Sequence, residues 1–225
     1  NCPQCKKITY KPDLFKNSYI CECSFHFDLP PKLRLISFFD SDYEIIKAPE
    51  NINPDPLGFV VKNGARKGYK YIDKIKKYRE ITGQKSALLC GAGNILGLSA
   101  VVVCFNFKFG GGRFGPMEAE HFLKASRYAI EKKVDIWIVV YQSSGIDVHT
   151  GVTGLSGMTK SVIALNELKS AGIPTFAIAA RAVAGGTYAS SFFMHDFIIV
   201  ESKCVENLLF SGKRVTANIL KGTDQ

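Results

Sequence analysis

The sequence predicts an α/β fold with a largely parallel sheet, preceded by a small metal-binding module. From residue 98 onward, apolar runs of strand length alternate with segments of helical periodicity. Three of these strands end in a glycine-containing corner and a helix follows each corner, which is the order of a repeated βαβ unit. Before them, two closely spaced cysteine pairs within the first 23 residues predict the metal-binding module.

Length and composition agree with a globular chain. The 225 residues allow one domain with a sizeable core and a small module, and 46% hydrophobic with 22% charged residues is ordinary. The net charge of +9 favours acidic partners: nucleic acid, an anionic membrane surface or phosphate-bearing cofactors. No apolar run approaches the length of a membrane span, and no signal peptide is recognised. Because the chain begins with Asn, we expect a fragment or a processed product.

Residues 1–29 are predicted to form a zinc ribbon. The pairs Cys2-Pro-Gln-Cys5 and Cys21-Glu-Cys23 are separated by 15 residues. Four thiolates in two close pairs suit a structural, tetrahedral zinc site. So short a segment buries too little apolar surface to fold alone, so the metal would supply its folding energy.

The second cysteine pair is one residue shorter than the usual two-residue gap. His26, three residues beyond Cys23, is therefore an alternative ligand for one of the four positions. The other cysteines lie singly among apolar residues and are predicted to be buried; they are Cys90, Cys104 and Cys204. This uneven, odd-numbered usage favours a reducing compartment over a secreted disulfide scaffold.

A linker and a helix are expected next. Residues 30–65 contain Pro30-Pro31 and several Asp and Pro turn signals, so we expect this linker to be irregular. Apolar residues at helical spacing predict a helix over Lys67–Thr82, and Gly83 is its expected stop. The later part of the chain, residues 66–225, is predicted to be the main domain, with a shortened C-terminal end.

A strand pair follows this helix. Ala87–Cys90 is predicted to be the first arm and Leu98–Phe109 the return arm. The glycine-rich segment Gly91–Gly97 is predicted to be the turn, with Asn94 in a left-handed conformation.

Three glycine corners then follow predicted strands, and each opens a predicted helix. They are Gly110–Gly115 before Pro116–Lys132, Gln142–Gly145 before Met158–Ser170, and Gly185-Gly186 after the strand Pro174–Ala180. Ligands of α/β folds gather at the carboxyl ends of parallel strands, so we expect the corners to lie near one another. Bare N–H groups at a helix start favour an anion. We therefore predict an oxyanion site for an acyl thioester at Gly185-Gly186, with a close-packed turn as the alternative.

The cysteine pairs and four later segments, in the same order, resemble the carboxyltransferase β subunit of bacterial and plastid-type acetyl-CoA carboxylase. The matching segments are Phe109–Pro116, Ser143–Thr150, Ala182–Phe192 and Phe210–Val215. In the first segment the family pattern is F-x-G-G-S-M-G-S, and in the second it is S-G-G-A-R-M-Q-E. The resemblance covers nearly the whole chain.

The resemblance implies a crotonase-like (ClpP/crotonase) ββα superhelix, whose backbone amides hold acyl-CoA thioesters. It implies transfer of a carboxyl group from carboxybiotin to acetyl-CoA, giving malonyl-CoA for fatty acid synthesis. The implied partners are a carboxyltransferase α subunit in an α2β2 hetero-oligomer, biotin carboxylase, and the biotin carboxyl carrier protein that bears the biotin. The implied cofactor of this chain is zinc, and the implied compartment is the plastid stroma, with the bacterial cytoplasm as the alternative.

The matched segments also indicate site residues. The predicted catalytic positions are Ser144, Gly145, Gly185 and Gly186, and the predicted substrate-binding positions are Gly111, Gly112, Arg113, Lys213 and Arg214. Arginine suits bidentate phosphate contacts, so the basic residues are expected to meet CoA phosphates, with solvated charges as the alternative. An enolate oxygen needs N–H donors, so no side-chain triad is required.

The chain departs from the family pattern at several positions. Asp147 stands where the family has Arg, and His149-Thr150 replaces Gln-Glu. The family's last segment, past Lys221, is missing. An alternative function is therefore a degenerate, non-catalytic structural subunit of a larger complex.

Two further hypotheses come from side chains. Lysines and Tyr10 between the cysteine pairs could touch nucleic acid, which makes a zinc-ribbon nucleic-acid binder a third hypothesis. Ser144, Asp147 and His149 contain the residue types of a hydrolytic triad. Three members within six residues rarely reach the required geometry, so we do not predict a triad. His121 and His195 are expected to be structural helix residues.

Overall fold

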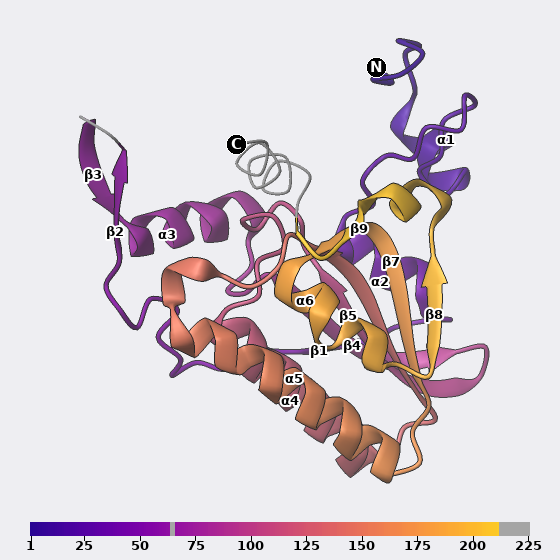
Figure 1. Cartoon of the computed structure of the whole chain (residues 1–225). Coiled ribbons are helices and arrows are strands. Elements are labelled where there is room, and N and C mark those ends of the chain that lie inside the picture. Colours follow the sequence, from indigo (N-terminus) through magenta and orange to yellow (C-terminus); the bar gives the residue numbers. More distant parts are fainter. Residues whose placement is uncertain (64–65, 212–225) are drawn as a thin grey trace, which may run out of the picture.

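The computed structural model describes residues 1–63 and 66–211, and its centre is one mixed sheet (Figure 1). The strand order is β1-β4-β5-β6-β7-β8, with β9 beside β7. Pairing is antiparallel from β1 to β5 and parallel from β5 onward, as the sequence predicts for a hairpin followed by βαβ units. The strands are β1 Glu44–Ile46, β4 Leu88–Ile95, β5 Leu98–Phe105, β6 Ile136–Ser143, β7 Thr175–Ala184, β8 Phe197–Val200 and β9 Leu208–Leu209.

Two long helices, α4 (Pro116–Lys132) and α5 (Val152–Ser170), cover one face of this sheet (Figure 1). The core between helices and sheet is aromatic: the Phe122 ring meets Trp137 edge-on at 5.4 Å. Helix α5 begins six residues earlier than predicted, passing through glycines. A Cβ on Gly157 would lie 3.2 Å from the Ala119 side chain, so this glycine allows the two helices to pack closely.

The opposite face of the sheet is covered by α2 (Pro31–Phe38), in the segment expected to be irregular. That expectation is wrong because Pro31 occupies the first turn of the helix, where proline is favoured. Leu35 is fully buried and belongs to a core cluster with Val102 and Val140. The rest of the segment contains β1 and the strand β2 (Val60–Asn63).

The predicted turn of the hairpin is also wrong. β4 runs on through Gly91 and Gly93, and the turn is Leu96-Gly97, with φ values of +51° and +79°. Asn94 pairs with Ser99 in the ladder. The glycines have a packing role instead, since a Cβ on Gly93 would lie 2.9 Å from the Phe39 ring.

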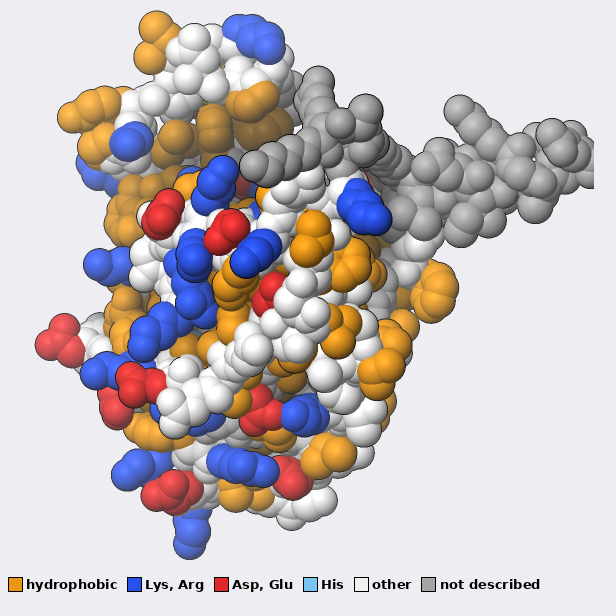
Figure 2. Space-filling view, turned by 90° about the vertical axis from the view of Figure 1, so that its left-hand side faces the viewer, with side chains coloured by type: hydrophobic (Ala, Val, Ile, Leu, Met, Phe, Trp, Pro, Cys, Tyr) orange, Lys and Arg blue, Asp and Glu red, His pale blue; other side chains and the backbone are white. Residues whose placement is uncertain are grey.

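Helix α3 (Tyr71–Thr82) follows a small hairpin of β2 and β3 (Arg66–Lys70). The predicted start of α3 at residue 67 is therefore four residues early, whereas Gly83 does end the helix in the left-handed conformation, with φ +67°. Lys76 and Lys77 are exposed. Lys and Arg side chains gather on the side of the molecule shown in Figure 2.

The N-terminal module contains a short helix, α1 (Lys11–Lys16), and lies beyond the upper end of β8 in Figure 1. Ion pairs join it and its neighbouring helix to the sheet: Asp28 pairs with Arg181 at the end of β7, and Arg34 lies 2.6 Å from Glu201. Among residues 1–63 and 66–211, no helix combines the length and apolarity that crossing a bilayer requires.

His195 is buried in the core, where it contacts Tyr141 of β6. His195 Nε2 lies 3.0 Å from the Tyr141 hydroxyl, and Nδ1 has no hydrogen-bond partner among the described residues. Burial lowers the pKa of His195 from 6.5 to about 3, and Lys169 adds to the effect. The burial of His195 supports the expected structural role, but the residue lies in extended backbone just after the 3-10 helix Phe192–Met194 and not in a helix.

Because the pKa of His195 is lowered in the folded chain, the protein should become less stable as the pH falls. Between its ordinary and its lowered pKa the unfolded chain binds more protons than the folded chain, so acid favours unfolding. We expect the free energy of unfolding of the wild type to drop by about 2 kcal/mol more than that of His195→Gln between about pH 7 and pH 5. Urea unfolding at both pH values measures this difference, and equal pH dependence in the two proteins would contradict it.

Candidate active site

The three glycine corners lie against one another. The Ser144 N–H donates to the Gly111 carbonyl at 2.8 Å, which joins the first corner to the second. A Cβ on Gly145 would lie 2.9 Å from the Ala184 carbonyl oxygen and 3.4 Å from the Gly186 nitrogen, so the second corner touches the third. The predicted gathering of the carboxyl ends of β5, β6 and β7 is confirmed.

Glycine is required where the first and second corners meet. Gly112 has φ +65°, and a Cβ there would lie 1.8 Å from the Gln142 carbonyl oxygen, inside van der Waals contact. The Ser143 hydroxyl also donates to the Gly112 carbonyl at 2.7 Å. Backbone therefore packs directly on backbone, which brings main-chain amides and carbonyls of two strand ends together.

The third corner is where β7 becomes α6 (Gly185–Ala189). Gly185 has φ +59°, and the Thr187 hydroxyl donates to the Ala184 carbonyl at 2.9 Å, which fixes the first turn. Helix α6 is only five residues long. Its macrodipole is correspondingly small, so any anion binding here depends on the N–H groups of the turn themselves.

Arg113 is buried and bonded to protein groups, which does not support the predicted phosphate contact. The side chain is 4% exposed. Its guanidinium lies 3.1 Å from Asp147 and 3.3 Å from Glu118, and donates to the Tyr71 hydroxyl at 3.1 Å. Burial alone would lower the pKa of Arg113, but Glu118, Tyr71 and Asp147 outweigh it and raise the pKa. The other two predicted phosphate contacts, Lys213 and Arg214, lie outside the described residues.

Within the described part of the chain, Ser144, Asp147 and His149 do not meet as a hydrolytic triad. Asp147 Oδ1 does lie 3.0 Å from His149 Nδ1. The His149 ring, however, stacks on Tyr71 with centroids 4.1 Å apart, and no contact found in the described part of the chain joins it to the Ser144 hydroxyl. The chemical groups at the corners are therefore mainly main-chain amides and carbonyls.

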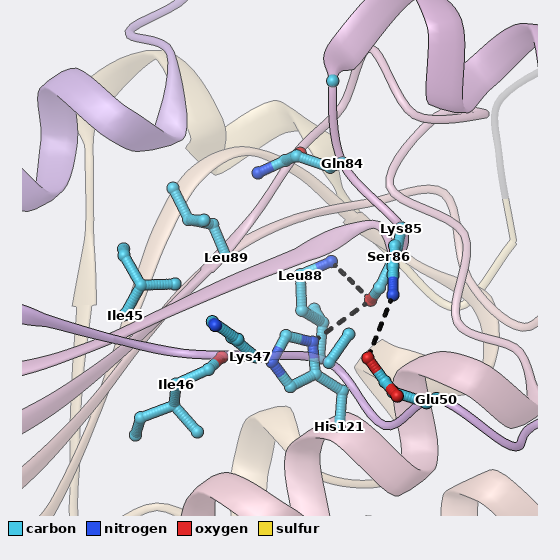
Figure 3. Close-up of a pocket in the computed structure, with 12 residues that line it drawn as sticks. Ile45, Ile46, Lys47, Glu50, Gln84, Lys85, Ser86, Leu88, Leu89 and His121 are labelled. Atoms are coloured by element: carbon cyan, nitrogen blue, oxygen red, sulfur yellow. Dashed lines mark hydrogen bonds and ion pairs between the residues drawn. The ribbon is translucent and has the colours of Figure 1, made fainter.

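The cavity in Figure 3 is separate from the corners. It has a volume of about 230 Å³, and none of the corner residues lines it. His121 Nε2 lies 2.8 Å from the Ile46 carbonyl, and Nδ1 lies 3.4 Å from the Ser86 hydroxyl. Burial lowers the pKa of His121. Both ring nitrogens have partners, so the predicted structural role of this histidine is supported.

The four N-terminal cysteines converge. Cys2 and Cys23 sulfurs lie 3.7 Å apart, as do Cys5 and Cys21, and all four lie within 4.8 Å of one another. Zinc–sulfur bonds of about 2.3 Å in a tetrahedron place sulfurs about 3.8 Å apart, so the thiols fit zinc. The group found in the described residues does not include His26.

The second cysteine pair, Cys21 and Cys23, accommodates its shorter spacing by a tighter turn. The Ser24 N–H donates to the Cys21 carbonyl, three residues back, whereas the Lys6 N–H reaches four residues back to Cys2. Both turns then close with a left-handed residue, Lys6 at φ +63° and Ser24 at φ +64°. The missing residue therefore changes the size of one turn without separating its cysteines.

Two of the residues around Arg113, Glu118 and Tyr71, were not singled out from the sequence. Glu118 lies in α4 beside apolar Met117, and both are buried. A carboxylate next to that apolar stripe is the signal that could have indicated a buried partner. Tyr71 is one of the apolar residues at helical spacing that predict the helix over Lys67–Thr82, and that pattern gives no sign of its hydroxyl contacts.

Comparison with known proteins finds several relatives. The carboxyl transferase domain family matches residues 72–223. The acetyl-coenzyme A carboxylase carboxyl transferase subunit beta of Sulfurihydrogenibium sp. (strain YO3AOP1) is 33% identical over 222 residues, covering 98% of this chain and 76% of that protein.

Solved structures share the fold. The transcarboxylase 12S hexamer core with hydrolysed methylmalonyl-coenzyme A bound has a TM-score of 0.67 at 22% identity, over 88% of this chain. A Pseudomonas malonate decarboxylase hetero-tetramer in complex with malonate has a TM-score of 0.62 at 16% identity, over 85% of this chain. The chain spans 34% and 64% of those two chains. These likenesses confirm the predicted crotonase-like α/β fold.

The close contact of the first two corners is testable with a matched pair of glycines. Gly112 and Gly97 both have positive φ, but a Cβ on Gly97 would meet nothing within 4 Å. Gly97→Ala should therefore cost only the left-handed strain, about 1–2 kcal/mol. Gly112→Ala should cost at least about 3 kcal/mol in the free energy of unfolding, because the added carbon overlaps a backbone carbonyl. Equal losses by urea unfolding would show that the contact is not rigid.

Proposed function

The chain belongs to the carboxyl transferase domain family, and from that premise we propose that it is the β-type carboxyltransferase subunit of an acetyl-CoA carboxylase. The observation that supports this most is the contact of three glycine corners at the carboxyl ends of β5, β6 and β7. Such a site offers main-chain N–H groups to a thioester oxygen, which is what acyl-CoA chemistry needs.

The proposed reaction makes a carbanion equivalent of the acetyl group. Removal of a proton from the acetyl methyl carbon turns the thioester carbonyl into an enolate oxygen, which the N–H groups of Gly185 and Gly186 stabilise. Loss of one such donor typically costs roughly 2.7–4 kcal/mol. Carboxybiotin, held on a separate carrier protein, would supply the carboxyl group that the enolate carbon accepts, and the biotin released would take up the methyl proton, giving malonyl-CoA and biotin.

The contacts between corners also suggest a role for Ser144 and Gly145 in the proposed reaction. Ser144 and Gly145 lie between the first and third corners, so they set the separation of Gly111-Gly112 from Gly185-Gly186. The proposed role of these residues is to hold the acyl group in one orientation, which lowers the entropic part of the barrier.

A non-catalytic subunit is the second candidate. Its main support in the sequence is the acidic residue Asp147, where a basic one is expected. In the structure Asp147 is buried and bonded to Arg113 and Tyr71, so its charge does not face the corners as an unpaired group. The geometry therefore favours the active subunit.

Zinc and the assembly complete the proposal. The four cysteines would hold one zinc ion with a structural role, since four protein sulfurs leave no open position. The proposed assembly includes a carboxyltransferase α subunit, biotin carboxylase and the biotin carrier protein. The plastid stroma, with the bacterial cytoplasm as the alternative, stays the proposed compartment. Nucleic-acid binding by the lysines around the ribbon is a lesser alternative, which salt-dependent RNA binding would test.

Activity is testable in the assembled complex. The chain, combined with a carboxyltransferase α subunit and carboxybiotin carrier protein, should convert acetyl-CoA to malonyl-CoA, and should run the reverse reaction from malonyl-CoA. Carrier protein carboxylated beforehand by biotin carboxylase with ATP and radiolabelled bicarbonate carries the label, and label found in malonyl-CoA measures the product. Absence of turnover in both directions by a complex whose assembly has been verified by light scattering would overturn the proposed function.

Zinc binding is testable by metal analysis. The purified chain should contain about one zinc per chain, and Cys21→Ser should lose most of it because three sulfurs bind zinc more weakly than four. Glu22→Ala is the matched control, since this exposed residue lies between two ligands without belonging to the cysteine group. The site would be contradicted if the purified wild-type chain contained no zinc and if a chelator left its thermal unfolding temperature unchanged.

A further inference from the structure

A buried cluster of four side chains lies beside the first two corners. Arg113 follows the first corner, Asp147 follows the second, Glu118 comes from α4 and Tyr71 from α3. Each of the four is at most 4% exposed. The cluster therefore joins four separate segments out of contact with solvent.

The distances show that the charges are paired. Arg113 Nε lies 3.1 Å from Asp147 Oδ2, and its Nη2 lies 3.3 Å from Glu118 Oε2. The Tyr71 hydroxyl donates to Asp147 Oδ2 at 2.8 Å and accepts from Arg113 Nη1 at 3.1 Å. Removal of Arg113 would leave the carboxylates of Asp147 and Glu118 buried without their shared partner, which proteins tolerate poorly.

The backbone beside this cluster forms a short parallel bridge between the two corners. The Phe114 N–H donates to the Gly145 carbonyl at 2.9 Å, and the Asp147 N–H donates to the Phe114 carbonyl at 2.9 Å. Glu118 accepts from the Gly115 N–H at 3.0 Å and, with its other oxygen, from the Ala87 N–H at 2.9 Å. The ion pair thus lies immediately beyond the bonds that align the corners.

We propose that Arg113 and Asp147 are a positioning pair for the proposed carboxyltransferase site, which fixes the alignment of Gly110–Gly112 with Ser143–Gly145. This inference rests on the proposed function for its effect on turnover. Both residues depart from the family pattern of the segments they match, Arg113 from Ser and Asp147 from Arg. In the structure these two residues meet, and the Arg113 guanidinium lies between the carboxylates of Asp147 and Glu118.

The pair allows a clear mutational test. Asp147→Asn keeps the shape and removes one charge, Arg113→Ser leaves two buried carboxylates, and Asp147→Arg places two guanidinium groups beside one carboxylate. The double variant Arg113→Ser/Asp147→Arg again has one Arg to pair with Glu118. Tyr71→Phe is a milder variant that removes only the bridging hydroxyl, and Asp73→Asn, at an exposed acid of α3, is the control.

Turnover of the assembled complex is the first readout. We expect each single charge variant to lower kcat at least tenfold per assembled complex, with KM for acetyl-CoA changed less than threefold, because the alignment matters for the transition state. Tyr71→Phe should lower kcat by less, and the double variant should recover at least a third of the wild-type value. Unchanged kcat in the single variants, with only their stability reduced, would overturn the positioning role.

Hydrogen exchange of the chain is the second readout and needs no activity. Amides of residues 110–115 and 143–147 should exchange at least tenfold faster in Asp147→Asn than in the wild type or in Asp73→Asn, and the double variant should restore protection. Unchanged exchange would overturn the positioning pair even if the wild-type complex is active. If the wild type shows no turnover while exchange responds as expected, the proposed function fails and the pair's control of corner alignment stands.

Discussion

The carbonyl oxygen of Gln142 occupies the space where a side chain at position 112 would have to begin, and the rest of the candidate site depends on that contact. Because no Cβ separates the two strand ends, the first corner can donate and accept main-chain hydrogen bonds with the second, and the second can touch Gly185 and Gly186. A site made of amides needs such closeness, since an amide cannot reach toward a ligand as a long side chain does. The glycines, which have no side chain, are therefore the residues on which this site depends most.

The buried charges follow from the same closeness. Corners that lack side chains contribute little apolar surface, so their alignment depends on hydrogen bonds and on neighbouring groups that hold them from outside. Arg113 and Asp147 occupy that outer position, and Glu118 connects them to the start of β4 through the amide of Ala87, the residue before it. An acidic residue that looks harmful when it is compared with a family pattern alone is neutralised by a partner 34 residues away in the sequence.

The sequence predicts the parts of this molecule that depend on local pattern. The βαβ order, the glycine corners and the cysteine module follow from periodicity and spacing, and all three are present. Local pattern fails where a distant contact decides: Gly93 resembles a turn residue but lies in a strand beneath Phe39. The substrate-binding role predicted for Arg113 lacks support for the same reason. Its partners come from three other segments, and only the folded chain shows that it is buried.

The contacts of the N-terminal module set an order of events during synthesis. Its thiols are at most 21 residues apart in the sequence, so the module can close as soon as it leaves the ribosome. Its contacts with the sheet span far longer loops: Asp28 meets Arg181 across 153 residues, and Lys203 reaches the His26 carbonyl across 177. Such long loops close slowly. The contacts that dock the module can therefore form only after β7 and the residues beyond β8 have been made.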